Sequence, residues 1–339
     1  MFKIKLSVSG QPQNVSIQHF LGTENNTYKG CQFFINDDSC QDADYWLILD
    51  HIEKKESCLI DPKNIFLLHA EVLFPKSYWD AYPQYLDQFA KIFTCHDIFK
   101  DNVRYTLPFL PYMLFYKGGN LIHGNSVLNP IDRYIEDLVE YMPQKNKTLS
   151  VICSAKNGNE HHTMRLKFVQ KLKEHFKDKL DWFGAGINPV EQKLNAIAPY
   201  KYHLALENYS SYNNITEKLY DSYLGLSYPI YYGAPNAKDY FPTDSFSQIN
   251  IADLKGSTRQ IEEIIDSNLY EKNFNSLKKA QQITLDEFNV FKRMAEITLE
   301  DSNRKIKNKK ELITIDNYLL LKKKKTFISR MKRKISFIF

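Results

Sequence analysis

The stretch HLALENYSSYNNITEKLYDSYLGLSYPIYYGAP, residues 203–235, decides the fold class. HLALEN (203–208) is an apolar run typical of a buried strand, a polar loop follows, and YPIYYGAP (228–235) begins a second strand. Between them, helical periodicity from about residue 215 to 226 puts four apolar residues on one face: Ile215, Leu219, Tyr223 and Leu226. This order predicts an α/β fold with a parallel sheet, whose ligands bind beyond the carboxyl ends of the strands.

The rest of the chain extends this pattern into two domains. The expected strands upstream of residue 203 are 44–50, 64–74, 91–99, 148–155 and 181–186, with helices over 80–89 and 162–176. Residues 261–300 have a helical pattern, and prolines and a Gly-Gly pair mark a linker near Gly118. The sequence therefore predicts domains over 1–120 and 121–300 and a tail over 301–339.

Composition and charge indicate the kind of protein and its cellular compartment. The chain has 339 residues and a net charge of +5, yet residues 301–339 alone hold 13 Lys/Arg against 3 Asp/Glu, so the body is mildly acidic. Five scattered cysteines without a C-x-x-C pair favour reduced thiols over disulfides or zinc. No apolar run is long enough to span a membrane, and the N-terminus lacks a signal-peptide pattern. These features predict a cytoplasmic protein.

The start of the helix near residue 215 carries an acid and a base side by side. With Asn214 as N-cap, Glu217 completes a variant capping box. Alternatively, the free N–H groups at this helix start attract an anion that Lys218 helps to hold. Both interpretations stay open on spacing alone.

A second cation occurs on the helix over 162–176. Arg165 shares a face with Val169, Leu172 and Phe176, so it either extends into solvent or projects towards the ligand of the neighbouring strand. Arg165 and Lys218 together could neutralise a pyrophosphate. Neither a P-loop nor a G-x-G-x-x-G fingerprint is present to explain such a site.

Longer motifs name a family. KYHLALEN, NNITEKLYDSYLGLSYPIYYGAP and SFSQINIADL resemble the signature of the α1,3-fucosyltransferases, glycosyltransferase family 10, of the bacterial type. The resemblance spans about residues 199–254, with ordered matches back to residue 154, and is thin in the N-terminal half. It implies a GT-B fold, two Rossmann-like domains facing a central cleft, in which the C-terminal domain binds GDP-fucose and the N-terminal domain binds the acceptor. The implied reaction is an inverting transfer that needs no metal and no cofactor besides the donor.

The resemblance also implies roles for particular residues. Arg165 and Lys218 would hold the pyrophosphate, Glu217 would accept hydrogen bonds from donor hydroxyls, and Asn208 would line the phosphate region. Tyr212, Asn214 and Thr216 complete the expected donor-binding set.

Glu71 matches the glutamate of the family that acts as general base. It is the only carboxylate in an apolar run, where desolvation would raise its pKa and suit it to that role. His69, His96 and Asp97 are rival bases nearby in the sequence.

Two departures bear on the donor sugar. Asn213-Asn214 stands where the family has Asp-Tyr or Gly-Tyr, and Leu206 replaces an aromatic residue. Another GDP-linked deoxyhexose on the same scaffold, or a non-catalytic nucleotide- or glycan-binding protein, therefore remains an alternative.

The tail places Ile328, Met331, Ile335 and Ile338 opposite a dense Lys/Arg face. A basic amphipathic helix over 319–339 would bind an anionic membrane surface, at the inner face of the membrane, and would suit a lipid-linked glycan acceptor in surface polysaccharide or lipopolysaccharide synthesis. A disordered solvated tail is the alternative. Nucleic acid is not an expected partner, because the body is acidic and no recognised binding module occurs.

Overall fold

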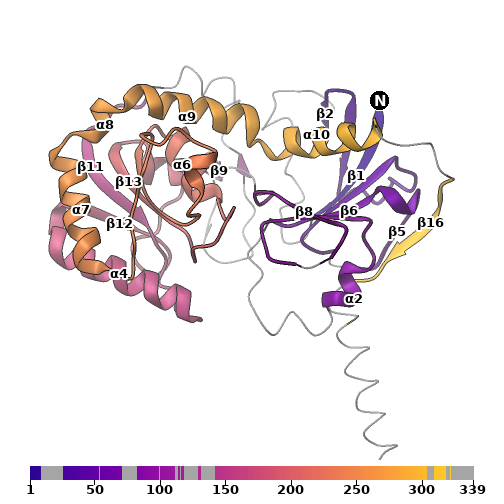
Figure 1. The fold of residues 1–339 in the computed structure, drawn as a ribbon, viewed down its shortest axis with the longest axis horizontal. Helices are drawn as coiled ribbons and strands as arrows, with labels where there is room; N and C mark the ends of the chain where they lie inside the picture. The colour runs from indigo at the N-terminus through magenta and orange to yellow at the C-terminus, as the bar shows by residue number, and fades with distance from the viewer. Residues whose placement is uncertain are drawn as a thin grey trace, which may run out of the picture. The chain divides into compact units, whose positions relative to one another are not determined.

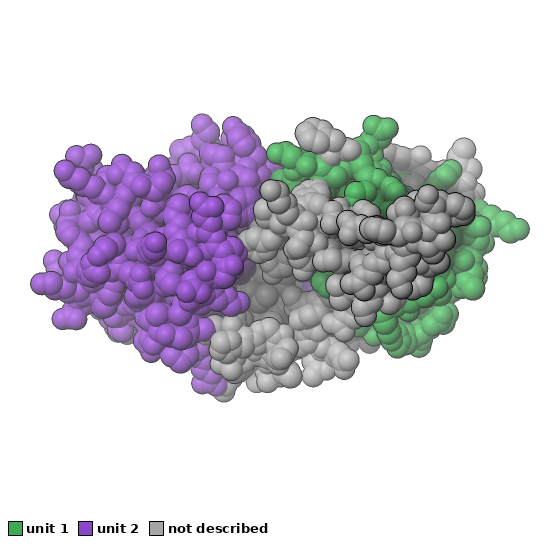
Figure 2. All heavy atoms as spheres, turned by 90° about the horizontal axis from the view of Figure 1, so that it is seen from below, with its two compact units in different colours: residues 1–13, 24–109, 295–339 green, residues 14–23, 110–294 purple. Residues whose placement is uncertain are grey.

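The computed structural model describes residues 1–8, 26–52, 54–70, 82–98, 100–110, 114, 116–117, 129–130, 142–303, 309–317 and 321. The chain divides into two compact units (Figure 2): unit 1 comprises residues 1–13, 24–109 and 295–339, and unit 2 comprises residues 14–23 and 110–294. Each unit contains a parallel β-sheet, which confirms the α/β class. The units divide at residues 109 and 294, and residues 295–339 belong to the same unit as the N-terminal residues. The domains expected over 1–120 and 121–300 and the tail over 301–339 stay predictions.

Unit 2 has a sheet of five parallel strands in the order β12-β11-β13-β14-β15 among its described residues. Figure 1 labels β11, β12 and β13 of this sheet. The strands are β11 (Lys147–Ile152), β12 (Leu180–Phe183), β13 (Tyr200–Leu206), β14 (Tyr228–Tyr232) and β15 (Ser247–Gln248). Numbered from β11, this is the doubly wound order 2-1-3-4-5. The direction of winding reverses between β11 and β13, and ligands of such sheets bind at that switch point.

Helices cover both faces of this sheet. The helices of unit 2 are α4 (Glu160–Phe176), α5 (Lys193–Ile197), α6 (Glu217–Leu224), α7 (Leu254–Asp266), α8 (Leu269–Lys272) and α9 (Phe274–Glu287). A further helix, α10 (Val290–Ser302), begins in unit 2, and its residues from 295 onward belong to unit 1. One core cluster joins α4 and α7 to alternate residues of β11 and β13 such as Val151 and Leu204. The residues between them, such as Ser150 and His203, point to the opposite face, where α5 and α6 contact the sheet.

The helical periodicity predicted for unit 2 is confirmed. Ile215, Leu219, Tyr223 and Leu226 are all fully buried. The helices of residues 254–302 also agree with the helical pattern expected over 261–300.

Unit 1 has a second doubly wound sheet, in the order β2-β3-β1-β4-β6-β7-β8, which is parallel except for β2. Its strands are β1 (Phe2–Val8), β2 (Thr27–Tyr28), β3 (Cys31–Ile35), β4 (Tyr45–Leu49), β6 (Ile65–Leu68), β7 (Lys91–Thr94) and β8 (Val103–Tyr105). The expected strands of the N-terminal half appear as β4, β6 and β7, and the expected helix as α2 (Tyr82–Leu86). The periodicity of the sequence did not predict β1 or β3.

Two small antiparallel pairs complete the described elements. β9 (Tyr116–Lys117) pairs with β10 (Asn129–Pro130), and β5 (Glu56–Ile60) pairs with β16 (Glu311–Ile315). Residues 311–315 thus belong to the fold of unit 1, although the sequence placed them in the tail. Residues 318–320 and 322–339, and with them nearly all of the predicted membrane-binding helix, lie outside the described residues.

The five cysteines are buried and form no disulfide. In the part of the chain that the structure describes, no helix is long and apolar enough to cross a membrane.

Candidate functional site

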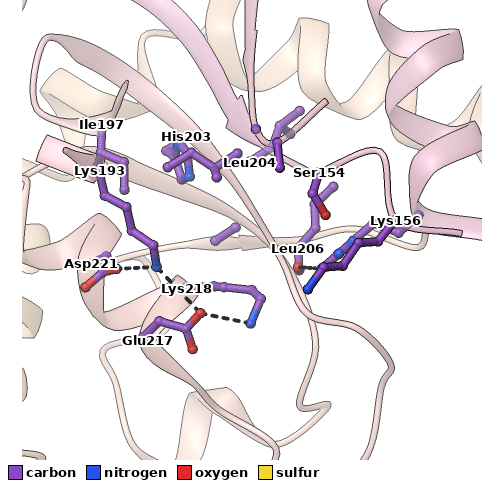
Figure 3. A pocket seen from close by; sticks show the side chains of 15 residues that line it. Ser154, Lys156, Lys193, Ile197, His203, Leu204, Leu206, Glu217, Lys218 and Asp221 are labelled. Carbon is purple, nitrogen blue, oxygen red and sulfur yellow. Dashed lines mark hydrogen bonds and ion pairs between the residues drawn. The ribbon is translucent and has the colours of Figure 1, made fainter. Parts of the chain in front are cut away.

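A pocket lies in unit 2 between the carboxyl ends of β11 and β13 and the helices α5 and α6 (Figure 3). Its walls include Ile152, Ile197 and Leu204. The charged side chains that line it are Lys156, Arg165, Lys193, Glu217, Lys218 and Asp221. The fold therefore brings Arg165, Glu217 and Lys218 together at the switch point, as a ligand site of this topology requires.

Close contact between two loops shapes one side of the pocket. Backbone N–H groups of Cys153 and Ala155 donate to the carbonyls of Phe183 and Ala185, both at 2.8 Å. Gly184 lies between these contacts at φ 145°, and a Cβ atom there would be 2.4 Å from the Cys153 carbonyl oxygen. Only glycine permits this approach, so DWFGAG positions the end of β12 against the end of β11.

Arg165 projects from α4 towards the end of β13. The helix is capped by Asn159, whose side chain accepts the backbone N–H of His162 at 2.8 Å. Arg165 Nη1 donates to the Leu206 carbonyl at 3.3 Å and to Asn208 Oδ1 at 2.6 Å, and the side chain is buried. The alternative in which Arg165 extends into solvent is therefore wrong. Burial raises the pKa of the Cys153 thiol, and the nearby Arg165 guanidinium opposes that effect.

The start of α6 differs from the expected capping box. The N-cap is Thr216, whose hydroxyl accepts the Lys218 N–H at 3.5 Å, and the helix begins at Glu217. Asn214 is fully buried, and its amide donates to the Tyr209 carbonyl at 3.0 Å. The prediction of Asn214 as N-cap is wrong because a tertiary contact, from Glu207 to Thr216, determines where the helix begins.

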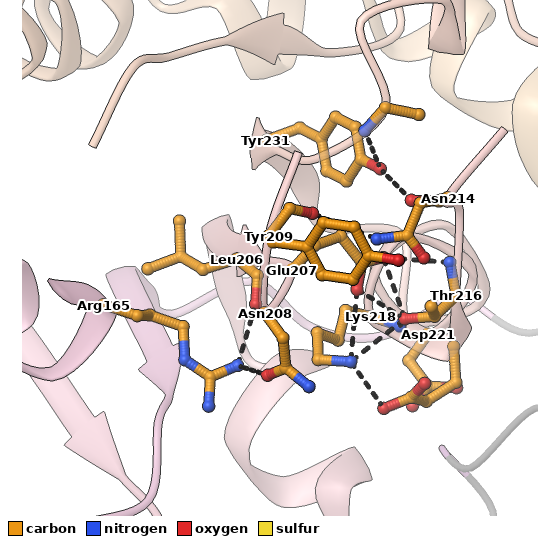
Figure 4. Close-up of polar contacts among 12 residues, drawn as sticks. Arg165, Leu206, Glu207, Asn208, Tyr209, Asn214, Thr216, Lys218, Asp221 and Tyr231 are labelled. Carbon is orange, nitrogen blue, oxygen red and sulfur yellow. Dashed lines mark hydrogen bonds and ion pairs between the residues drawn. The ribbon is translucent and has the colours of Figure 1, made fainter. Parts of the chain in front are cut away.

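Glu207 is buried and contacts the first residues of α6 (Figure 4). Its Oε1 accepts the Thr216 backbone N–H at 2.9 Å and the Thr216 hydroxyl at 2.8 Å, and Lys218 Nζ lies 3.2 Å from its Oε2. Burial raises the pKa of Glu207, and the Lys218 ammonium opposes that rise. No role was predicted for Glu207, although it stands between Leu206 and Asn208 in the recognised motif.

Glu217 and Lys218 form an ion pair at the pocket surface. Lys218 Nζ is 3.2 Å from Glu217 Oε1, and both side chains are partly exposed. Burial alone would raise the pKa of Glu217, but the ammonium groups of Lys218 and Lys193 outweigh it and hold that pKa well below its usual value. Burial would likewise lower the pKa of Lys218, but the Glu207 and Glu217 carboxylates raise it. Both groups are therefore charged near neutral pH.

Lys193 and Asp221 were not predicted as site residues. Lys193 Nζ lies 2.9 Å from Asp221 Oδ2 and 3.5 Å from Glu217 Oε1 (Figure 3). The buried Asp221 shares a helix face with Glu217 one turn earlier, a spacing that could have suggested it. Lys193 has no such signal, because it comes from another helix.

The remaining predicted donor residues lie around the pocket. Asn208 is half-buried and bonded to Arg165. Thr216 is buried beneath Lys218, and Tyr212 is 69% exposed. Asn208, Tyr212, Asn214 and Thr216 are not among the described residues that line the pocket. Their roles in donor binding stay predictions.

In unit 1, the expected base Glu71 lies outside the described residues. Of its rivals, His69 is buried with Nδ1 2.8 Å from the Thr94 hydroxyl, and burial together with His96 lowers the pKa of His69 to about 3. A histidine so hard to protonate and so enclosed is a weak candidate for contact with an acceptor. Asp97 is exposed, and His96 is buried.

Within the described ranges, no group of three or more His, Cys, Asp or Glu side chains has the arrangement of a metal site.

Known proteins match part of unit 2 in sequence. Residues 142–275 match the family model described as glycosyltransferase family 10 (fucosyltransferase) C-term. The chain is 37% identical over 76 residues to the Helicobacter pylori alpha-(1,3)-fucosyltransferase FucT, a segment covering 22% of this chain and 15% of that protein. It is 30% identical over 142 residues to the 4-galactosyl-N-acetylglucosaminide 3-alpha-L-fucosyltransferase 9 of Mus musculus, covering 40% and 38%. The matches thus span well under two thirds of these relatives.

The fold as a whole is similar to that of solved structures. A crystal structure of an α1,3-fucosyltransferase with GDP-fucose has a TM-score of 0.52 at 16% identity, over 91% of this chain and 92% of that chain. A second structure of an α1,3-fucosyltransferase, with GDP, has a TM-score of 0.51 at 16% identity, over 88% and 90%. At this identity the similarity concerns the fold, and it agrees with the expected GT-B class of two Rossmann-like domains.

Proposed function

The chain belongs to glycosyltransferase family 10 through residues 142–275, and from this premise we propose that it transfers fucose from GDP-fucose to a glycan hydroxyl in α1,3 linkage. The observation that carries the proposal is the convergence of Arg165 and Lys218 at the switch point of the unit 2 sheet. Two fixed cations at the carboxyl edge of a doubly wound sheet suit a diphosphate.

The donor would bind with its diphosphate between these cations. Arg165 offers a planar fork and Lys218 a point charge, and Asn208 holds the Arg165 fork from one side. As the bond from the sugar to GDP breaks, negative charge grows on the leaving diphosphate, and preorganised cations stabilise that charge without reorganising. The ionised Glu217 would accept hydrogen bonds from donor hydroxyls beside them.

The acceptor chemistry needs a base in unit 1. A hydroxyl that attacks the anomeric carbon loses its proton as it does so, and one displacement inverts the configuration. Glu71 is proposed for this role because of its place in the family motif. The proposed acceptor is a GlcNAc-containing glycan of a surface polysaccharide or lipopolysaccharide, and residues 319–339 would hold the enzyme at the anionic inner face of the membrane.

The decisive experiment is a donor screen with purified protein. GDP-fucose and other GDP-linked deoxyhexoses are incubated with GlcNAc-containing acceptors, and both transfer and slow donor hydrolysis are measured. Turnover of GDP-fucose above the others supports the proposal, and preference for another GDP-sugar would move it to that donor. Binding of GDP without transfer to any acceptor would favour a non-catalytic binding protein.

Two variants test the finer assignments. Glu71→Gln should abolish transfer and leave GDP affinity unchanged, and full transfer by this variant would exclude Glu71 as the base. A chain ending at residue 318, which keeps β16, should lose co-sedimentation with anionic liposomes. Retained co-sedimentation would exclude a membrane role for residues 319–339.

A further inference from the structure

Lys193 occupies the junction of two carboxylates in the pocket (Figure 3). Its ammonium is 2.9 Å from Asp221 Oδ2 and 3.5 Å from Glu217 Oε1. The other oxygen of Asp221 accepts the backbone N–H of Leu114 at 3.0 Å, and the Asp221 side chain is fully buried. Because Asp221 is fixed on both sides, it anchors Lys193 in one place beside Glu217.

The second cation near Glu217 is shared. Lys218 Nζ lies 3.2 Å from a carboxylate oxygen of Glu217 (Figure 3). It also lies 3.2 Å from Glu207 and 3.0 Å from the Thr216 hydroxyl (Figure 4). An ammonium that shares its charge with an anionic ligand is a weaker counter-ion for these carboxylates. Lys193 is then the one other Lys, Arg or His in the described part of the chain within 4 Å of Glu217.

We propose that Lys193 is a positioning residue of the donor site: it is the counter-ion that keeps Glu217 ionised and oriented when Lys218 engages the diphosphate of a nucleotide sugar. The inference rests on the proposed function for the identity of that ligand. Lys193 itself acts through Glu217, and Asp221 acts through Lys193. Asp221, Lys193 and Glu217 form a row of alternating charge. Glu217, at its end, is the residue expected to accept hydrogen bonds from hydroxyls of the nucleotide sugar.

The surroundings of Glu217 make the effect of Lys193 measurable. The charged or titratable groups that line the pocket around it are Lys193 from α5, Lys218 and Asp221 from α6, Arg165 and Lys156 from α4 and the segment before it, and His203 from β13, with Glu207 beneath. Burial would raise the pKa of Glu217, and Lys218 and Lys193 are the cations that lower it. When Lys218 also faces a diphosphate, loss of Lys193 leaves the partly buried Glu217 carboxylate without a second cation within 4 Å among the described residues, and its pKa rises.

The test compares Lys193→Met with Lys193→Arg and with Lys171→Met. The last variant removes an exposed ion pair with Glu174 on α4, at 2.7 Å, and serves as the matched control. For Lys193→Met, the acid limb of kcat/KM for GDP-fucose should move up by about 1 pH unit or more, because an opposite charge at this distance shifts a carboxyl pKa by about 1–3 units. KM near pH 6 should rise about tenfold while kcat changes less, since a ground-state contact with the donor is lost. Lys193→Arg should restore the profile, and Lys171→Met should leave it unchanged.

A second measurement separates this inference from the proposed function. The Glu217 carboxyl is titrated by ¹³C NMR in wild type and Lys193→Met, with its signal assigned from a Glu217→Gln spectrum, first in the free protein and then with GDP. A pKa of Glu217 that rises by about 1 unit or more in Lys193→Met supports the role of Lys193 even if the wild type does not turn over GDP-fucose. Superimposable titrations in the two proteins would overturn it, whatever the donor.

Discussion

Thr216→Val removes one hydroxyl from the junction of Glu207 and Lys218 and leaves the shape of the side chain nearly unchanged. That hydroxyl lies 2.8 and 2.7 Å from the two carboxylate oxygens of Glu207 and 3.0 Å from Lys218 Nζ. It also caps α6 through the Lys218 backbone N–H. The residue is buried, so water cannot replace the lost donor without entering the core.

The magnitude follows from these contacts. Loss of an N-cap costs about 1 kcal/mol, and a buried carboxylate that loses a hydrogen-bond donor costs about 1.5–3 kcal/mol. Together they lower the free energy of unfolding of unit 2 by about 3 kcal/mol. For a folding unit of about 150–250 residues, this corresponds to a fall in Tm of about 6–12 °C.

Differential scanning calorimetry measures the change, because it resolves separate transitions if the two units unfold independently. Thr216→Ser keeps the hydroxyl and should cost less than about 1 kcal/mol, which makes it the matched control. In a Glu207→Gln background the cost of Thr216→Val should shrink, since the carboxylate that needs the hydroxyl is gone. A Thr216→Val protein within 0.5 kcal/mol of wild type would refute the role of this hydroxyl, where about 3 kcal/mol is expected.

Two further predictions concern the pocket cation and the opposite edge of the sheet. Arg165→Lys should weaken the affinity for GDP about 10- to 100-fold, as measured by isothermal titration calorimetry, because lysine cannot contact the Leu206 carbonyl, Asn208 and a phosphate at once. The control Arg259→Lys changes an exposed arginine and should leave the affinity unchanged. Equal affinities of Arg165→Lys and wild type would exclude Arg165 from the site. Lys145 donates to the Ala198 and Gly225 carbonyls at 2.7 Å, and burial lowers its pKa from 10.5 to about 7. The folded protein then binds fewer protons than the unfolded chain between these values, so the free energy of unfolding should rise with pH from about 7 towards 10.5, by up to about 1.4 kcal/mol per pH unit. Urea titrations at several pH values should show that the free energy of unfolding of Lys145→Met rises less steeply with pH than that of wild type. The same slope in both proteins would contradict the lowered pKa of Lys145.

Local periodicity predicted much of unit 2. The apolar spacing of α6 and the shared face of Arg165, Val169 and Leu172 are properties of single helices, and the structure confirms both. The sequence left two directions open for Arg165, and the contacts of its guanidinium with the Leu206 carbonyl and Asn208 decide between them.

Local periodicity could not predict contacts between distant segments, because these contacts depend on the order of the strands in the sheet. Lys193 meets Asp221 across 28 residues, and this meeting depends on α5 and α6 covering the same face of the sheet. The pairing of β5 with β16 joins segments about 257 residues apart, as the 2.8 Å contact between the Ser57 and Thr314 hydroxyls shows. The prediction of Asn214 as N-cap was wrong for the same reason. Glu207 accepts the backbone N–H of Thr216, and this contact between two segments makes Thr216 the N-cap although the local sequence favoured Asn214.

The two asparagines that depart from the family pattern are explained by the loop they build. Asn213 has φ 60°, a left-handed conformation that asparagine adopts more readily than most residues, and its Oδ1 accepts from Asn236 at 2.8 Å and from the Tyr240 hydroxyl at 2.6 Å. Asn214 is fully buried, and its carbonyl accepts from the Tyr231 hydroxyl at 3.2 Å. Neither belongs to the described lining of the pocket. Because these residues hold the loop together, their departure from the pattern is weak evidence against fucose. The proposed contact of Glu217 with donor hydroxyls, with Lys193 3.5 Å away, is the better place to test the choice of donor.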